Sequence, residues 1–64
     1  MPRFKEGDRV LIQENAGPLF VGVIGVVEDV KPNPRNIERL DSYTVVFAWG
    51  EKRQFWDAQL ELAP

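Results

Sequence analysis

The sequence contains neither cysteine nor histidine among its 64 residues. The lack of cysteine excludes disulfide bonds, zinc fingers and thiol nucleophiles, and the lack of histidine excludes an imidazole general base. Only carboxylates, hydroxyl groups and lysine amines remain for catalysis. No Gly-x-Gly-x-x-Gly, Walker or Gly-x-Ser-x-Gly sequence occurs either. We therefore expect no catalytic residue, no metal site and no cofactor.

The chain also lacks an excess of positive charge and a long hydrophobic run. Eight basic residues are spread among ten acidic ones, and the net charge is -2. Proteins that bind nucleic acid usually carry a basic face that neutralises phosphates, so this balance argues against nucleic acid as a partner. The longest apolar run, residues 18–27, is too short to span a bilayer, and residues 1–9 do not resemble a signal peptide. We expect a cytoplasmic protein that does not contact a membrane.

Length limits the chain to one domain, residues 1–64, near the lower size at which a hydrophobic core alone stabilises a fold. Homo-oligomerisation therefore stays open. Five short hydrophobic segments, each beside turn residues or a break, occupy residues 8–12, 22–30, 43–47, 52–56 and 60–62. In the first, Val10 and Ile12 alternate with Arg9 and Leu11, which is the period of a half-buried strand.

Glycine argues against a helix in the second segment. Gly22 and Gly25 would each cost about 1 kcal/mol relative to alanine in a helix interior. Within a strand, glycine permits the bends and the close strand approach that a small closed sheet needs. We therefore predict a strand, with Val27 and Val30 facing the core around a bulge.

The order of the five segments predicts an all-β, SH3-like, five-stranded antiparallel small barrel. Residues 49–51 form a compact hairpin turn, and residues 57–59 resemble a single 3-10 turn before the last strand. Residues 31–41 form one long irregular segment, because Pro32 and Pro34 lack a donor N–H, with room for a helical turn at 36–40. Whether this segment is a binding loop or a plain connection stays open.

The sequence has more large aromatic rings than such a barrel can bury. Of seven rings, the interior holds about three or four, and strand phase assigns Phe47 and Phe55 to the core. Trp49 lies in a turn, Trp56 lies at an outward strand position, and Phe20 lies in a loop. Exposed aromatic rings near arginine are typical of protein-interface hot spots, although both tryptophans could instead cover the barrel.

We therefore predict a partner-binding surface made of the loop at 19–20, the 31–41 loop and the hairpin at 49. Charges at residues 51–53 either keep the hairpin soluble or form an electrostatic rim for docking. The candidate partner-binding residues are Leu19, Phe20, Arg35, Arg39, Trp49, Lys52 and Trp56.

The chain resembles a known group of small SH3-like proteins. The resemblance is carried by Gly7-Asp8-Arg9-Val10, Gly22-x-x-Gly25-x-Val27-x-x-Val30, Val45-x-Phe47, Phe55 and Leu60-Glu61-Leu62. These residues resemble the SH3-like subunits of photosynthetic electron-transfer complexes: the variable subunit of ferredoxin-thioredoxin reductase and the photosystem I subunit that helps to dock ferredoxin. The resemblance implies a non-catalytic accessory subunit beside an iron–sulfur partner, in the cytoplasm or a stroma-like compartment.

A second resemblance implies an enzyme. Gly7-Asp8-Arg9-Val10, Arg53-Gln54-Phe55-Trp56 and Leu60-Glu61 are similar to the type II dihydrofolate reductases, which are tetramers of SH3-like barrels around one pore. It implies NADPH-dependent reduction of dihydrofolate. Only Gln54 is identical to the Val-Gln-Ile-Tyr strand of those enzymes, and Arg53 replaces a small apolar residue.

A third alternative is an RNA- or transcription-associated SH3-like module. Such a module needs basic residues and exposed aromatic rings on one surface. Arg35, Arg39 and Trp49 would supply that patch, with Glu38 and Asp41 diluting its charge. Of the three classes, we favour a non-enzymatic interaction or accessory module that binds another protein.

Overall fold

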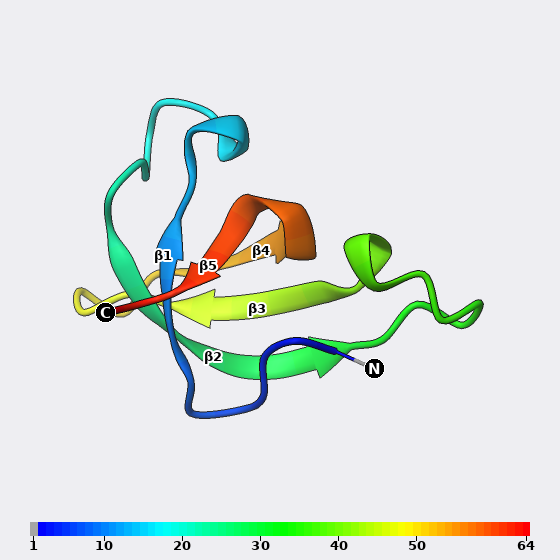
Figure 1. Cartoon of the computed structure of the whole chain (residues 1–64). Coiled ribbons are helices and arrows are strands. Elements are labelled where there is room, and N and C mark those ends of the chain that lie inside the picture. The colour runs from blue at the N-terminus through cyan, green and yellow to red at the C-terminus, as the bar shows by residue number, and fades with distance from the viewer. Residues whose placement is uncertain (1) are drawn as a thin grey trace.

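The computed structural model describes residues 2–64 and consists of five strands and three short 3-10 helices (Figure 1). The strands are β1 (Arg9–Ile12), β2 (Ile24–Lys31), β3 (Ser42–Val46), β4 (Lys52–Trp56) and β5 (Leu60–Leu62). The 3-10 helices are η1 (Glu14–Ala16), η2 (Glu38–Leu40) and η3 (Asp57–Gln59). No α-helix occurs within residues 2–64.

All strand pairs are antiparallel, and the strand order in the sheet is β4-β3-β2-β1-β5. Strands β4 and β5 therefore form the two edges, although they follow each other in the chain and only η3 separates them. The sheet is open, because these two edges do not pair. The prediction of an all-β fold with five antiparallel strands and a 3-10 turn before the last strand is confirmed.

Three predicted strands have different boundaries in the structure, and the smallest difference is in β1, which begins at Arg9 and not at residue 8. Strand β2 begins at Ile24 and not at Gly22, whose φ of 79° belongs to a turn. In that turn the Gly22 N–H donates to the Ile12 carbonyl at 3.1 Å. Strand β3 ends at Val46, because Phe47 already belongs to the hairpin, where its carbonyl accepts the Gly50 N–H at 2.9 Å.

The predicted bulge in the second strand is confirmed. The pairing of β2 with β3 shifts register between Val27 and Asp29, so Val27 pairs with Val45 and Val30 pairs with Tyr43. Val27 is buried, and Val30 is half-buried and packs against the core. Within the long connection from β2 to β3, the helical turn is η2, which begins at Glu38 and not at residue 36.

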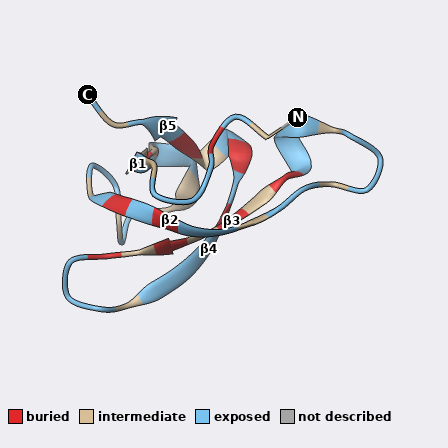
Figure 2. Ribbon diagram, turned by 90° about the horizontal axis from the view of Figure 1, so that it is seen from below, coloured by how far each residue is buried: buried red, intermediate tan, exposed pale blue. Residues whose placement is uncertain are grey.

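The core lies on the inner face of the curved sheet (Figure 2). Its buried side chains are Phe4, Val10, Ile12, Val27, Tyr43, Val45, Phe47, Phe55 and Leu60. Four of the seven aromatic rings are thus buried, as the size of the domain predicts, and Phe47 and Phe55 are among them. The surplus rings belong to Phe20, which is half-buried, and to the two exposed tryptophans.

Two buried carboxylates, Asp41 and Asp57, tie the segments outside the sheet to one another. The Arg3 guanidinium donates to the Asp57 carboxylate and to the carbonyl oxygens of Asp57 and Leu60, each at 2.9 Å. The Asp41 carboxylate accepts the Asn33 N–H, and the Asp41 carbonyl accepts the Asp57 N–H at 2.9 Å. These bonds compensate the desolvation of both carboxylates, and they hold the N-terminal segment and the 31–41 loop against η3.

Tyr43, the only tyrosine, makes the fold sensitive to high pH. Burial raises the pKa of the Tyr43 phenol above its ordinary value of 10.0, against the opposing effect of the Phe4 N–H, which donates to the hydroxyl at 3.4 Å. A group whose pKa is higher in the folded than in the unfolded state makes its full contribution to stability below the unfolded pKa. That contribution is lost as the pH rises from the unfolded pKa through the folded pKa. We expect the free energy of unfolding to fall above about pH 10.

Ultraviolet absorbance of tyrosinate, recorded in parallel with circular dichroism, measures this ionisation at a single site. The Tyr43→Phe variant is the control, because it keeps the ring and should lose the contribution of the phenol to the alkaline fall in stability. A phenol that ionises at its ordinary pKa while the circular dichroism stays native would contradict the prediction.

Candidate functional site

Four aromatic rings form a continuous group at one end of the sheet. This aromatic cluster consists of Phe20, Phe47, Trp49 and Phe55. The Phe47 ring stacks on Phe20 with 4.8 Å between ring centroids and on Trp49 with 5.0 Å, and both pairs lie within 8° of parallel. The Phe55 ring is nearly perpendicular to the rings of Phe47 and Phe20, with 6.2 and 6.3 Å between the ring centroids. Such offset and edge-to-face contacts add to the stabilisation from burial.

Local backbone geometry brings these rings together from three places in the chain. The β3–β4 hairpin closes through the Phe47 N–H, which donates to the Glu51 carbonyl, and Gly50 takes a φ of 92° in its turn. That turn places Trp49 two residues after the buried Phe47, where the two rings stack. Phe20 comes from the connection between η1 and β2, where its carbonyl accepts the Val23 N–H at 3.0 Å.

Hydrogen bonds to Glu51 hold the polar atoms of the cluster in place. One carboxylate oxygen accepts the Trp49 indole N–H at 3.0 Å, and the other accepts Nε–H of Arg53. These two donors hold the pKa of Glu51 below its ordinary value. The Arg53 guanidinium also lies 5.5 Å from the centroid of the Phe20 ring, in a cation–π contact. Contacts within the chain therefore orient both the indole and the guanidinium.

A shallow hollow lies beside the cluster, between the 16–20 segment and strand β4. It has a volume of about 240 Å³, and its lining includes Leu19, Phe20 and Arg53. Leu19 is 81% exposed and Trp49 is 58% exposed, so two large apolar side chains face solvent at this end. Leu19, Phe20 and Trp49 can therefore make apolar contacts with a ligand, and the Arg53 guanidinium can contribute one oriented positive charge.

Only some of the predicted partner-binding residues meet here. Leu19, Phe20 and Trp49 lie at this end, but Arg35 and Arg39 do not. The 31–41 loop precedes β3 and the Trp49 hairpin follows it, so the full length of β3 separates them (Figure 1). The single surface that we expected from three loops is therefore divided between two ends of the molecule.

The other two predicted residues also lie elsewhere. Trp56 is 53% exposed at the far end of β4, opposite Ser42, and stacks on no member of the cluster. Lys52 lies on the outer face of the sheet, where its Nζ donates to Glu28 at 2.8 Å. Both side chains thus belong to other surfaces.

Arg53 and Glu51 belong to this site but are missing from the predicted partner-binding residues, because the charges at 51–53 were interpreted either as keeping the hairpin soluble or as a docking rim. Their spacing of two along an extended segment places them on one face of the hairpin, which is a signal that could have paired them. Their distance from Phe20 depends on how a remote loop packs, and no local pattern encodes that.

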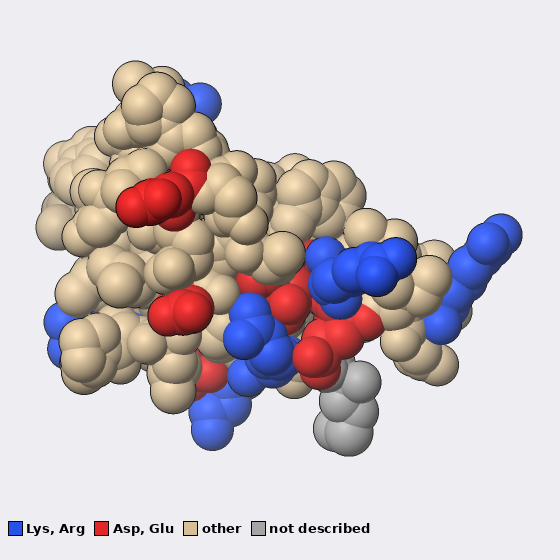
Figure 3. Space-filling view, turned by 45° about the horizontal axis from the view of Figure 1, so that its top comes forward, with Lys and Arg blue, Asp and Glu red and all other residues tan. Residues whose placement is uncertain are grey.

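Charged side chains are mixed in sign over the surface. In Figure 3, Lys and Arg side chains lie at the right, in the lower middle, at the top and at the left edge of the view, and Asp and Glu side chains lie among them. Because Arg35 and Arg39 are also remote from Trp49, the aromatic and basic residues of the RNA-binding alternative do not form one patch. Gln54, which carries the reductase resemblance, is exposed on β4.

Within residues 2–64, no three acidic side chains gather closely enough to hold a metal ion. No helix in this part of the chain has the length and apolar composition needed to cross a bilayer. Comparison with known proteins identified no matching family model and no matching curated protein.

Proposed function

We propose that the chain is a non-enzymatic protein-interaction module, and that it binds another protein through the aromatic cluster and Leu19. The observation that carries this proposal is the exposed indole of Trp49, which is stacked on the buried Phe47 ring and hydrogen-bonded to Glu51. Trp, Tyr and Arg dominate the binding energy of protein interfaces. A side chain that is already ordered loses little conformational entropy on binding, so a held indole is a favourable anchor.

We also propose that the fold is an SH3-like barrel. Two features support this assignment: the strand order β4-β3-β2-β1-β5, and the 3-10 helix η3 between the two edge strands. The antiparallel strand order puts the loop before β2 and the β3–β4 hairpin at the same end of the sheet. Phe20 and Trp49, 6.4 Å apart between ring centroids, come from these two connections.

Selection of a displayed library of random peptides on the immobilised protein tests the binding proposal. We expect enriched peptides whose affinity falls about tenfold or more in Trp49→Ala, because the loss of a central aromatic anchor costs at least about 1.4 kcal/mol. Isothermal titration with the enriched peptides measures the change.

Trp56→Ala is the matched control, because this tryptophan is similarly exposed but lies at the other end of β4. Circular dichroism of both variants checks that each is folded. The proposal is wrong if no peptide is enriched above an empty matrix, or if Trp49→Ala and Trp56→Ala lower the affinity equally.

A further inference from the structure

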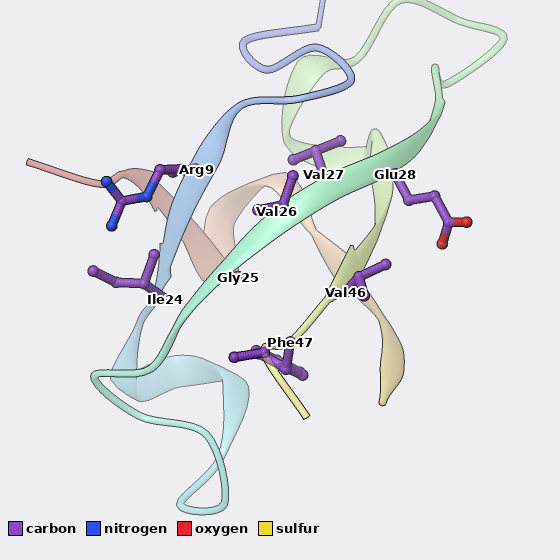
Figure 4. A pocket seen from close by; sticks show the side chains of 9 residues that line it. Arg9, Ile24, Gly25, Val26, Val27, Glu28, Val46 and Phe47 are labelled. Atoms are coloured by element: carbon purple, nitrogen blue, oxygen red, sulfur yellow. The ribbon is translucent and has the colours of Figure 1, made fainter. Parts of the chain in front are cut away.

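A second apolar surface lies on the outer face of the sheet, away from the core. Outward-facing residues of β1, β2 and β3 line a groove of about 580 Å³ there, together with the buried Gly25, Val27 and Phe47 and with Ala48 of the β3–β4 hairpin. Its floor includes Ile24, Val26 and Val46 (Figure 4). Ile24 is 37% exposed and Val26 is 42% exposed, so two β-branched side chains of one strand remain in contact with water.

Charges border this floor on two sides. Arg9 pairs with Val26 across β1 and β2, and no acidic group within residues 2–64 forms an ion pair with it. Glu28 lies two residues beyond Val26 on β2, and Figure 4 shows Arg9 and Glu28 on opposite sides of this strand. Oε1 of Glu28 accepts from Lys52, and Oε2 has no cationic partner among residues 2–64.

This arrangement is complementary to itself. Measured from Val26, the backbone of Arg9 is about 5 Å away across the sheet, and that of Glu28 is about 7 Å away along the strand. Consider a two-fold axis that lies in the plane of the interface and passes over Val26, midway between the direction to Arg9 and the direction to Glu28. Rotation about this axis exchanges the Arg9 position with the Glu28 position. It places Arg9 of each copy against Glu28 of the other, and the apolar floors face each other.

We propose that this outer face binds a second copy of the chain to form a two-fold symmetric dimer. The apolar floors supply the contact area, and the two Arg9–Glu28 pairs set the orientation. The groove shares Phe47 with the aromatic cluster, but the pairing rests on Val26, Arg9 and Glu28, which are not members of that cluster. Because the floor is small compared with the interface of a permanent dimer, association is weak, with a Kd of about 0.1 mM.

Sedimentation velocity of the full chain, over a concentration series up to about 1 mM, measures this equilibrium. We expect reversible dimerisation, and we expect Val26→Asp to abolish it, because a carboxylate would then be buried in the apolar floor. Arg9→Glu should raise Kd about tenfold or more, since it sets like charges against each other.

Two further variants separate a specific pair from a general effect of charge. Arg39→Glu makes the same change of charge on the exposed 31–41 loop and should leave Kd unchanged. The triple variant Arg9→Glu, Glu28→Arg, Lys52→Glu reverses every charge around the floor, preserves the internal ion pair in reversed form, and should restore dimerisation. A wild-type chain that stays monomeric throughout the series would overturn the proposal, as would a dimer that Arg9→Glu weakens no more than Arg39→Glu does.

Discussion

Replacement of Phe47 by alanine is expected to lower the free energy of unfolding by about 4 kcal/mol. The Phe47 ring is 2% exposed and contacts three other rings: Phe20, Trp49 and Phe55. Its removal leaves a cavity at the centre of the aromatic cluster, and the cavity cost adds to the lost burial. No other ring of the cluster contacts both Phe20 and Trp49 at 5.0 Å or less.

Urea unfolding, followed by circular dichroism, measures this loss. A domain of this size has a total stability of about 3 to 10 kcal/mol, so Phe47→Ala brings the chain close to unfolding. Phe47→Leu, with an expected loss of about 1.5 kcal/mol, keeps the comparison measurable if the alanine variant does not fold.

Trp56→Ala is the control for this series, because its side chain is exposed and should change stability by no more than about 0.5 kcal/mol. The placement of Phe47 at the centre of the cluster would be contradicted if Phe47→Leu were as stable as the wild type. It would also be contradicted if Trp56→Ala were the more destabilised variant.

Replacement of Gly25 by alanine is expected to lower the free energy of unfolding by about 3 kcal/mol. At an open position in a strand the same change would stabilise by about 0.5 to 1 kcal/mol, since glycine loses more backbone entropy on folding. Gly25 faces the core, and an added Cβ would lie 2.3 Å from Cγ1 of Val45 and 3.1 Å from the carbonyl oxygen of Val46. The oxygen belongs to the backbone of β3, so it can move only if the strand moves.

A double-mutant cycle with Val45→Ala separates this clash from other effects. Val45→Ala removes the nearest methyl group, so the double variant should be more stable than the sum of the two single losses predicts, by about 1 to 2 kcal/mol. Asp29→Ala, an exposed change on the same strand, is the control for altered strand propensity. Strict additivity in the cycle would show that Gly25 is not packed against Val45.

Much of the fold follows from short patterns in the chain. Val10 and Ile12 alternate with two outward residues, and both are buried because alternate residues of a strand point to opposite faces. The same reasoning placed Phe55 in the core. The β4 and β5 segments have the predicted boundaries because turn residues interrupt the apolar pattern at both ends.

Strand ends were harder to predict where an apolar run continues through a turn. Residues 19–23 are nearly all apolar, yet β2 begins only at Ile24. The positive φ of Gly22 and its hydrogen bond to Ile12 decide that boundary. A one-dimensional pattern shows that the segment is apolar but does not show which backbone groups its amides will reach.

The sequence by itself determined that the protein is all-β, how many strands it has, that Phe47 and Phe55 are buried, and that the chain has more aromatic rings than its core can hold. These properties depend on residues that are neighbours along one strand, and period and turn residues encode them locally. Only the tertiary structure decided that Arg53 lies beside Phe20 and Trp49, whereas Trp56, Arg35 and Arg39 lie apart from them. Strand order and register bring distant loops together, and these depend on contacts between remote segments that no local pattern specifies.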